Sequence, residues 1–529
     1  MRAPAALAAV LFAALLTGCA VGPDYVRPQA ATGAEFKEAA GWKRAEPADT
    51  ALRGDWWRIY GDPVLDGLMA QVETANQTLA QSEAQYRQAL ALIRGTRAGL
   101  YPTVTGNASA TRSGTGASSS VTTNSNGTII NNGGSGGSNI RNQFSLNAGV
   151  SWEADLWGSI RRSVEADTAS AQASAANVGA ARLSAQSTLA RTYFQLRVMD
   201  EQERLLEATI RVYERSLRLN ENRYAAGVSA RADIAQARTQ LESARAQAID
   251  LQWQRAQLEH AIAILAGQPP STFSLAAAPL NPALPDIPVG LPSELLERRP
   301  DVAAAERQVA AANARIGVAQ AAYFPSLTLS ASLGYRSSSF ADWLTAPARF
   351  WSLGPALAAP IFDAGLRRSQ VEQARAAYDA QVAAYRQTVL SALAETEDYL
   401  VQLRVMAQEQ DVQQRALDAA RESLRLANNQ FESGLIDYLS LATLQTSALN
   451  NERTMLTLLG SRLTASVQLI AALGGGWDPS QIPPPIGAAQ PGNGAPQAGD
   501  TPTAAASPAG AASAAQTADA TSPQAAGGR

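Results

Sequence analysis

The chain is poor in the residues from which most catalytic and metal sites are made. Its 529 residues include one histidine, His260, and one cysteine, Cys19. A lone histidine in a helix-like stretch provides neither a metal-binding cluster nor a Ser-His-Asp or Cys-His pair, and a single cysteine has no disulfide partner. No pair of carboxylates stands out as an acid and a base. We therefore expect no enzymatic activity, no metal and no cofactor.

Charge of one sign and long apolar runs are scarce as well. The 43 Lys and Arg residues and 46 Asp and Glu residues leave a net charge of −3, and no basic run occurs. This balance argues against binding to nucleic acid. The apolar run at 5–16, about twelve residues long, is too short to cross a bilayer as a helix, but it has the length of a signal peptide's apolar core.

The apolar run ends in Leu16-Thr17-Gly18-Cys19, which fits the lipobox of bacterial lipoproteins. Residues 1–18 are then a signal peptide that is removed, and the thiol of Cys19 carries acyl chains such as palmitate. Ala20 follows Cys19 where an aspartate could stand, and this favours the outer membrane in the usual Gram-negative sorting pattern. The alternative is an incidental or buried cysteine after an ordinary signal peptide.

An internal repeat organises the rest of the chain. The stretch 158–267 returns at 365–474, and Gln195–Met199 returns as Gln402–Met406, at an offset of 207 positions (402 − 195). One offset covers the whole segment. The two halves of the protein should therefore fold in the same way.

Each copy has the composition of a helical hairpin with unequal arms. Residues 161–226 contain no proline and a single glycine, Gly179, and they are rich in strong helix formers. A break at Gly227 separates a long helix of roughly 100 Å from a second helix of about 57 Å at 229–266. A helix at 77–99, about 35 Å long, would nearly fill the difference if it stacked end to end with the short arm. A soluble coiled coil is the alternative for such alanine-rich helices.

Between the helical segments the pattern changes to alternation with a period of two, which is typical of strands. Apolar residues from Phe144 to Trp152, and again from Leu327 to Tyr335, alternate with small or polar ones. Runs of about ten residues bracketed by aromatic side chains suit tilted strands that cross a bilayer. A soluble hairpin with one wet face is the alternative. The Ser/Gly/Asn/Thr-rich stretch 113–142 should be a mobile, solvent-facing loop. We expect four strands, at about 102–111, 143–153, 325–335 and 351–362.

Four membrane-crossing strands cannot close on themselves without leaving unpaired backbone groups in hydrocarbon. Other copies of the chain must complete the barrel. The sequence alone demands an oligomer without fixing the number of its copies.

Several motifs then occur in a specific order. They are the lipobox followed by Gly22-Pro23-Asp24-Tyr25, the pair Trp56-Trp57 with Asp62-Pro63-Val64-Leu65, Arg299-Pro300-Asp301-Val302, and Ala472–Trp477. Over about residues 16–477 the chain resembles the outer-membrane factor family, the TolC-like efflux lipoproteins of the OprM/NodT branch. The resemblance implies a mainly α fold with a transmembrane part: a homotrimer whose twelve-stranded β-barrel, in contact with outer-membrane lipids, continues into a hollow periplasmic α-barrel of long helices.

We divide the chain into six segments on these grounds. They are a signal peptide at 1–18, a lipidated N-terminal linker at 19–63, a first repeat at 64–267, a connector at 268–292, a second repeat at 293–476, and a tail at 477–529. The tail has no aromatic residue beyond Trp477 and cannot bury a core, so we expect it to be disordered.

The resemblance implies a function in transport. The chain would be the passive outer-membrane exit duct of a tripartite efflux pump, working with a periplasmic adaptor protein and an inner-membrane transporter of the resistance-nodulation-division class. One alternative is an outlet for protein secretion. Another, from a different class, is a structural envelope lipoprotein, a coiled coil tethered at Cys19 without a pore. A wide duct lined by Ser, Thr, Asn and Gln contacts its cargo loosely, so the sequence does not indicate the substrate.

The helix breaks at Gly227 and Gly434 lie farthest along the hairpins from the strands, and they look like the tips that receive adaptor hairpins in this family. Glycine suits the left-handed turn that ends a helix. The alternative is that both glycines serve only as helix stops. We assign to docking Tyr224, Gly227, Val228, Phe431, Gly434 and Leu435.

A second site, the periplasmic aperture, should lie just past the tips. Asp233, six residues past the first break, is similar to an aspartate that narrows the aperture in family channels. The second hairpin has Ser440 and Thr443 where relatives often have aspartates, and Leu439 occupies the place of an aperture leucine. We expect closure mainly by Leu439, with Asp233 and Asp437 contributing polar contacts between helices. The alternative is that Leu439 merely packs between helices.

Overall fold

The computed structural model of the protein describes residues 20–31, 33, 35–38, 54–115, 121–123, 129–131, 139–280, 284–285, 287, 298–478, 480 and 482. All of these belong to one compact unit, Met1–Pro485. The expected signal peptide, Cys19, much of the loop 113–142 and nearly all of the tail 477–529 lie outside the described residues.

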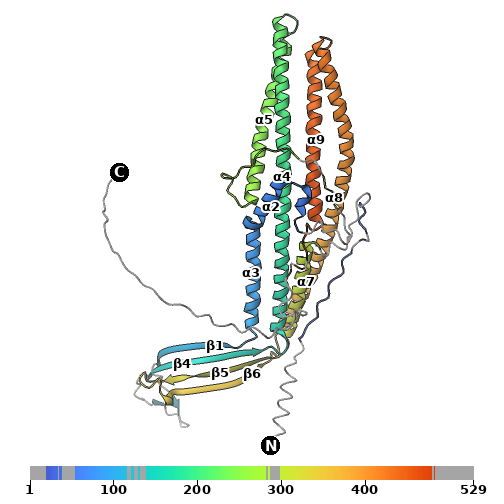
Figure 1. The fold of residues 1–529 in the computed structure, drawn as a ribbon. Helices are drawn as coiled ribbons and strands as arrows, with labels where there is room; N and C mark the ends of the chain where they lie inside the picture. The colour runs from blue at the N-terminus through green and yellow to red at the C-terminus, as the bar shows by residue number, and fades with distance from the viewer. Residues whose placement is uncertain are drawn as a thin grey trace, which may run out of the picture. The chain divides into compact units, whose positions relative to one another are not determined.

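Two helical hairpins of identical proportions form the larger part of the described chain (Figure 1). The first consists of α4 (Ser159–Ala225) and α5 (Arg231–Leu265), and the second of α8 (Leu366–Glu432) and α9 (Tyr438–Ala472). Both long arms have 67 residues and both short arms 35, at the offset of 207 (366 − 159 and 438 − 231). The expected pair of unequal hairpins is confirmed.

Each short arm is extended by a second helix stacked on its end (Figure 1). Helix α3 (Gln77–Ala98) continues α5, and α7 (Pro300–Ala321) continues α9. At the first joint Asn76 Nδ2 donates to the Leu265 carbonyl at 2.9 Å, and at the second Arg299 Nη1 donates to the Ala472 carbonyl at 3.2 Å. These donors satisfy carbonyls that the end of a helix would otherwise leave without a partner.

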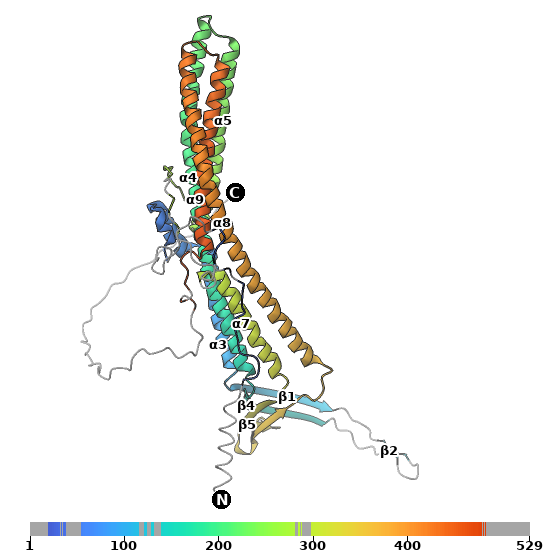
Figure 2. The same ribbon diagram turned by 90° about the vertical axis from the view of Figure 1, so that its right-hand side faces the viewer.

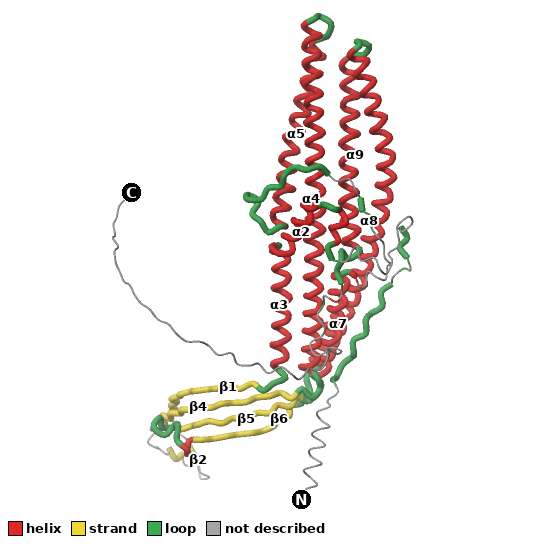
Figure 3. Tube along the Cα trace, in the orientation of Figure 1, coloured by secondary structure: helices red, strands yellow, loops and turns green. Residues whose placement is uncertain are grey.

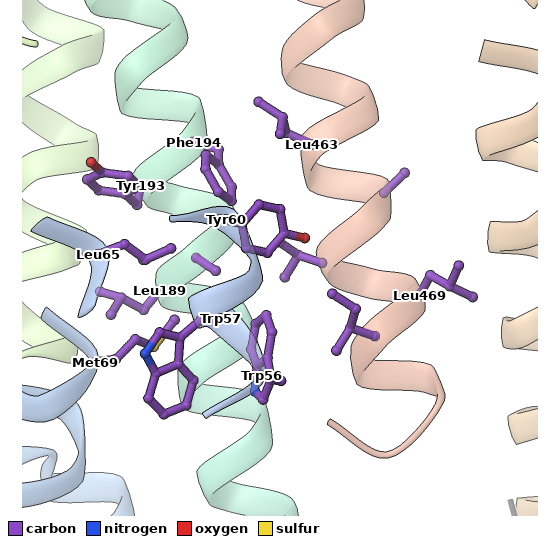
Figure 4. Close-up of a cluster of buried hydrophobic side chains, with 14 of the residues drawn as sticks. Trp56, Trp57, Tyr60, Leu65, Met69, Leu189, Tyr193, Phe194, Leu463 and Leu469 are labelled. Atoms are coloured by element: carbon purple, nitrogen blue, oxygen red, sulfur yellow. The ribbon is translucent and has the colours of Figure 1, made fainter. Parts of the chain in front are cut away.

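The tryptophan-rich segment before the first repeat is folded into the core between the two halves (Figure 4). It forms the 3₁₀-helix η1 (Trp56–Tyr60) and helix α2 (Pro63–Ala75), which Asp62 caps. The Trp56 indole Nε1 donates to Gln186 Oε1 of α4 at 3.1 Å, and the Tyr60 hydroxyl lies 2.7 Å from Ser466 Oγ of α9. Around them pack the apolar side chains of Trp57, Leu65, Met69, Leu189, Tyr193, Phe194, Leu463 and Leu469.

The single glycine of the long helix has a packing role. A Cβ at Gly179 would lie 2.5 Å from Nε1 of Trp477, which is closer than real Cβ atoms approach. Trp477 is 8% exposed and packs against Ala176 and Ala304. Ordered packing therefore extends through Trp477, the residue at which the tail is expected to begin.

The strands form one antiparallel sheet in the order β1-β4-β5-β6 (Figure 3). A short separate pair is formed by β2 (Val121–Thr123) and β3 (Ile129–Asn131), and the 3₁₀-turn η3 (Ala346–Ala348) precedes β6. The sheet strands are β1 (Thr103–Thr115), β4 (Asn139–Ala154), β5 (Ser326–Ser337) and β6 (Arg349–Ala358).

The strand ends differ from the expected positions. Strands β1 and β4 stay paired out to Thr115 and Asn139, because backbone pairing continues beyond the point where apolar alternation stops. Strand β6 ends at Ala358, four positions before the expected 362. Its partner β5 begins at Ser326, which pairs with Ala358, so β6 ends where its partner strand begins.

The sheet has one apolar and one polar face. On the polar face hydroxyls meet across strands, with Ser109 Oγ 2.7 Å from Ser145 Oγ and Ser332 Oγ 2.8 Å from Ser352 Oγ. The other face exposes large apolar side chains, namely Val104, Leu146, Leu333, Trp351, Leu353 and Leu357. We call this the outward face. Within the described chain β1 and β6 each pair along one edge only.

The contact at Gly179 gives a test of the packing. We expect Gly179→Ala to cost about 1–3 kcal/mol, because the methyl group must displace the Trp477 indole. The melting temperature of the purified protein should fall. Gly67→Ala in the interior of α2 is the matched control, because a Cβ there meets nothing within 4 Å. It should stabilise by about 0.5–1 kcal/mol. Equal melting temperatures for the two variants would contradict this account.

Candidate functional site

The two hairpin tips are left-handed turns built on glycine. Gly227 has φ +76° and Gly434 has φ +75°. The Val228 amide donates back to the Arg223 carbonyl at 2.9 Å, and the Leu435 amide does the same to Gln430 at 2.9 Å. A Cβ built on either glycine meets nothing within 4 Å, so backbone conformation alone requires glycine there.

The tips present apolar side chains to solvent. Val228 is 74% exposed and Leu435 is 75% exposed, and Tyr224 is also exposed. Phe431, the repeat counterpart of Tyr224, is only 4% exposed, and its ring lies 5.8 Å from that of Tyr438. Of the six residues assigned to docking, Phe431 therefore belongs to the core beneath the tip.

An arginine that the sequence does not single out joins the two tips, which lie side by side in both ribbon views (Figures 1 and 2). Arg223 Nη2 donates to the carbonyls of Phe431 at 2.8 Å and Glu432 at 3.1 Å, and the guanidinium lies 4.4 Å from the Phe431 ring centroid. The repeat counterpart of Arg223 is Gln430. That departure from the repeat is the signal that could have identified it.

A small core lies beneath the tips and holds a buried hydroxyl. It is formed by Ala237 of the first hairpin with Ala427, Phe431, Tyr438, Leu441 and Ala442 of the second. The Tyr438 hydroxyl has no hydrogen-bond partner among the described residues. Burial, and then the neighbouring Tyr213 and Asp233, raise the pKa of Tyr438 to about 12.

The two aspartates assigned to the aperture cap their own helices. Asp233 Oδ2 accepts from Ser229 Oγ at 2.8 Å and from the Ala230 amide at 3.2 Å, at the start of α5. Asp437 accepts from the Ser440 amide at 2.9 Å at the start of α9, and hydrogen bonding to Ser440 lowers its pKa. Helix N-termini offer free amides to carboxylates. In one chain these side chains therefore accept hydrogen bonds from amides of their own hairpins.

The remaining residues assigned to the aperture lie on the solvent-exposed side of α9. Leu439 is 59% exposed, and Ser440 and Thr443 are exposed as well. The Thr443 hydroxyl donates to the Leu439 carbonyl at 2.9 Å, so it is satisfied within its own helix. Leu439 does not pack between helices of one chain.

A hollow farther along the hairpins carries no charged group. It has a volume of about 700 Å³ and lies between α4, α5, α8 and α9. Its walls are mainly glutamines and apolar side chains, among them Gln195, Gln202, Gln402, Met199 and Met406. Among the described residues no group of three or more His, Cys, Asp or Glu side chains is placed to hold a metal ion.

The segment after Cys19 runs along the helices from the strand end upward. The Val21 amide donates to the Trp157 carbonyl at 3.0 Å, and Asn313 Nδ2 donates to the Pro23 carbonyl at 2.9 Å. Farther on, the Glu397 carboxylate accepts from the amides of Lys37 at 2.7 Å and Glu38 at 2.9 Å. The first described residues after Cys19 therefore lie beside the junction between the sheet and α4.

Long paired hairpins joined to a four-stranded sheet with an exposed apolar face define a class of protein, the outer-membrane channel subunit. The sequence profile of the outer membrane efflux protein family matches residues 68–268 and 291–475. The chain belongs to this family. It resides in the outer membrane and is the exit duct of an efflux pump, and its family consists of channel proteins. This membership separates it from a structural coiled-coil lipoprotein.

Individual relatives are similar over most of their length. The pyoverdine export outer membrane protein OpmQ of Pseudomonas aeruginosa is 31% identical over 427 residues, which are 80% of this chain and 87% of the relative. The outer membrane protein OprJ of the same organism is 30% identical over 485 residues, which are 90% of this chain and 97% of the relative. The solved outer-membrane channel OprN has a TM-score of 0.77 at 31% identity, covering 87% of this chain and 100% of that one.

The contact between the tips generates a prediction. Arg223→Ala removes two charge-assisted hydrogen bonds and should destabilise the junction by about 1–3 kcal/mol. The amides of Gly434 and Leu435 should then exchange hydrogen faster. Arg231→Ala, which removes an exposed arginine at the start of α5, is the matched control and should leave those amides unchanged. Unaltered exchange in the Arg223 variant would show that the tips are not coupled through this side chain.

Proposed function

We propose that three copies of this chain form the passive duct of a tripartite pump, together with a periplasmic adaptor and an inner-membrane transporter of the resistance-nodulation-division class. One observation carries the proposal. The described sheet has an exposed apolar face, and its edge strands β1 and β6 each have one edge without a partner. Hydrocarbon does not tolerate unpaired backbone groups, so β6 of one copy must pair with β1 of the next.

Exposed apolar side chains on the helices support the same assembly. On one flank of the chain, Leu92 of α3 and Ile249 of α5 are exposed. On the other flank α8 exposes Leu390, Val405 and Val412. Helices α3 and α5 pack on α4, and α8 lies beyond α7 and α9, so these sets lie on opposite sides of each chain. Packing of α8 against α3 and α5 of the next copy would bury both sets and close a ring of helices.

A lipid on Cys19 fits this placement. Cys19 lies outside the described residues, but the Val21 amide is held at Trp157, where the strands end. Acyl chains on Cys19 would then enter the membrane beside the barrel, adding an anchor that the barrel itself does not require. The mass of the mature chain would reveal whether Cys19 is its first residue and carries lipid.

The exposed apolar tips are the surface that the adaptor would contact. Val228→Glu and Leu435→Glu each place a charge where an apolar contact is proposed. Both variants should form the same oligomer with unchanged conductance, while cells that depend on the pump become several-fold more susceptible to its substrates. Wild-type susceptibility in the double variant would remove the docking assignment, and lost conductance would mean that the pore itself was damaged.

We propose that Leu439 closes the periplasmic aperture. Three exposed leucines converging on the axis of a trimer would exclude water without needing charge. The two capping aspartates would keep the adjoining helix starts in place. Among the described residues no feature of the tips favours protein secretion over efflux.

Leu439→Ala should raise the single-channel conductance of the isolated trimer, because it shortens the side chain that restricts the opening. Asp233→Asn is the matched control. Asparagine can still accept from the Ala230 amide, so conductance should change less. Wild-type conductance in both variants would rule out an aperture formed by these residues.

A further inference from the structure

The charges of the four sheet strands are sorted by position. Each strand carries one arginine near the end that is remote from the helices, and these are Arg112 of β1, Arg141 of β4, Arg336 of β5 and Arg349 of β6. The only carboxylate in the four strands is Glu153, near the opposite end of β4. One rim of the sheet is therefore basic. Passive conduction through the duct does not explain why arginines gather at this rim.

Strand register divides the four arginines between the two faces. Arg112 stands opposite Asn142, in the same alternate positions as Ala110 and Phe144, and Arg349 stands opposite Tyr335. Both therefore belong to the outward face, and we call them the outward pair. Arg141 and Arg336 fall on the polar face and form the inward pair, with the Arg336 guanidinium 4.9 Å from the centroid of the Phe350 ring.

Aromatic side chains place the outward pair at the level of a membrane interface. Tyr335 lies directly across from Arg349, and Trp351, two residues along β6, is exposed on the same face. Phe144 of the outward face packs against Phe340 and Trp343 of the β5–β6 connection, at ring distances of 5.5 and 6.0 Å. Such aromatic girdles mark the boundary between hydrocarbon and headgroups in membrane barrels.

Few carboxylates lie in the segments around the outward pair to neutralise its charge. Both side chains are exposed, and the sequence has no carboxylate between 101 and 152. Between 326 and 358 the only one is Asp342, in the connection between β5 and β6. A guanidinium remains charged at every physiological pH. On a lipid-facing surface it requires either water or an anion from the lipid itself.

We propose that the outward pair binds phosphate groups of lipid headgroups in the outer leaflet. Guanidinium groups match phosphate oxygens with two parallel hydrogen bonds, and arginines beside an anionic membrane surface strengthen binding to it. Strands β1 and β6 are the two edges of the sheet. In the proposed trimer, on which this arrangement rests, Arg349 of one copy lies at the same seam as Arg112 of the next. Each seam then presents a two-arginine phosphate site.

The experiment measures lipid retained by the purified trimer in native mass spectrometry. The probes are a doubly phosphorylated lipid A, the same lipid after removal of its phosphates, and inorganic phosphate. The wild-type trimer should hold the phosphorylated lipid in preference to the other two. R112Q/R349Q should bind it about thirtyfold more weakly, since each of the two arginines near an anionic surface contributes on the order of 1 kcal/mol. R141Q/R336Q removes the same charge from the polar face and should bind like wild type.

Equal lipid retention by R112Q/R349Q and the wild type would overturn the proposal. An equal loss in R141Q/R336Q would also overturn it, because net charge would then explain the effect. Retention of inorganic phosphate as strong as that of the lipid would refute a lipid headgroup as the ligand. If R112Q/R349Q does not assemble, R112K/R349K replaces it and should retain part of the binding, and full loss there would count against phosphate recognition. The same spectra report the oligomer, so failure of the wild type to form trimers would count against the proposed function instead.

Discussion

Backbone hydrogen bonding at the two edges of the sheet is the constraint on which the rest of the structure depends. The described strands bury neither face of their sheet within one chain, and the apolar face is exposed from Val104 on β1 to Leu357 on β6. In hydrocarbon such a sheet is stable only when every edge is paired. The solution open to a chain with four strands is to share its edges with copies of itself.

The helices satisfy the same demand for closure by different means. Each long arm needs a partner along its whole length, and a short arm alone cannot provide it. Stacking a second helix on each short arm fills the length, and the joints are held by different side chains, an asparagine at position 76 and an arginine at position 299. Each donates to the carbonyl of the last residue of the short arm on which the second helix is stacked. The repeat therefore preserves the geometry of the joint while its chemistry has diverged.

The sequence predicted the parts of the fold that depend on local periodicity. Helix formers without proline predicted the hairpins, alternation predicted the four strands, and the 207-residue offset predicted matching arms. Contacts between distant segments could not be predicted in this way. Gly179 is unremarkable in sequence, and only the approach of Trp477 explains it. The ends of β1 and β4 lie beyond the expected positions because backbone pairing does not depend on whether a side chain is apolar.

The candidate sites show the same division. The turns at Gly227 and Gly434 follow from helix-ending chemistry and were predictable. The bridge from Arg223 to the second tip joins positions 208 residues apart and breaks the repeat, so no local pattern reveals it. The roles of Asp233 and Asp437 depend on which amides lie nearest, and in one chain those are amides of their own hairpins. Contacts between copies of the chain form only in the assembled oligomer, so local sequence patterns do not predict them.

The most direct test of this account is the single-channel conductance of the purified, untagged protein in a planar lipid bilayer. Sheets that complete one another's edges enclose a water-filled pore, so the account predicts step-like currents of uniform size. The mass of the membrane-inserted oligomers is verified in the same sample. If such oligomers give no current steps, even with Leu439 replaced by alanine, the result contradicts the claim that copies of this chain close into a duct.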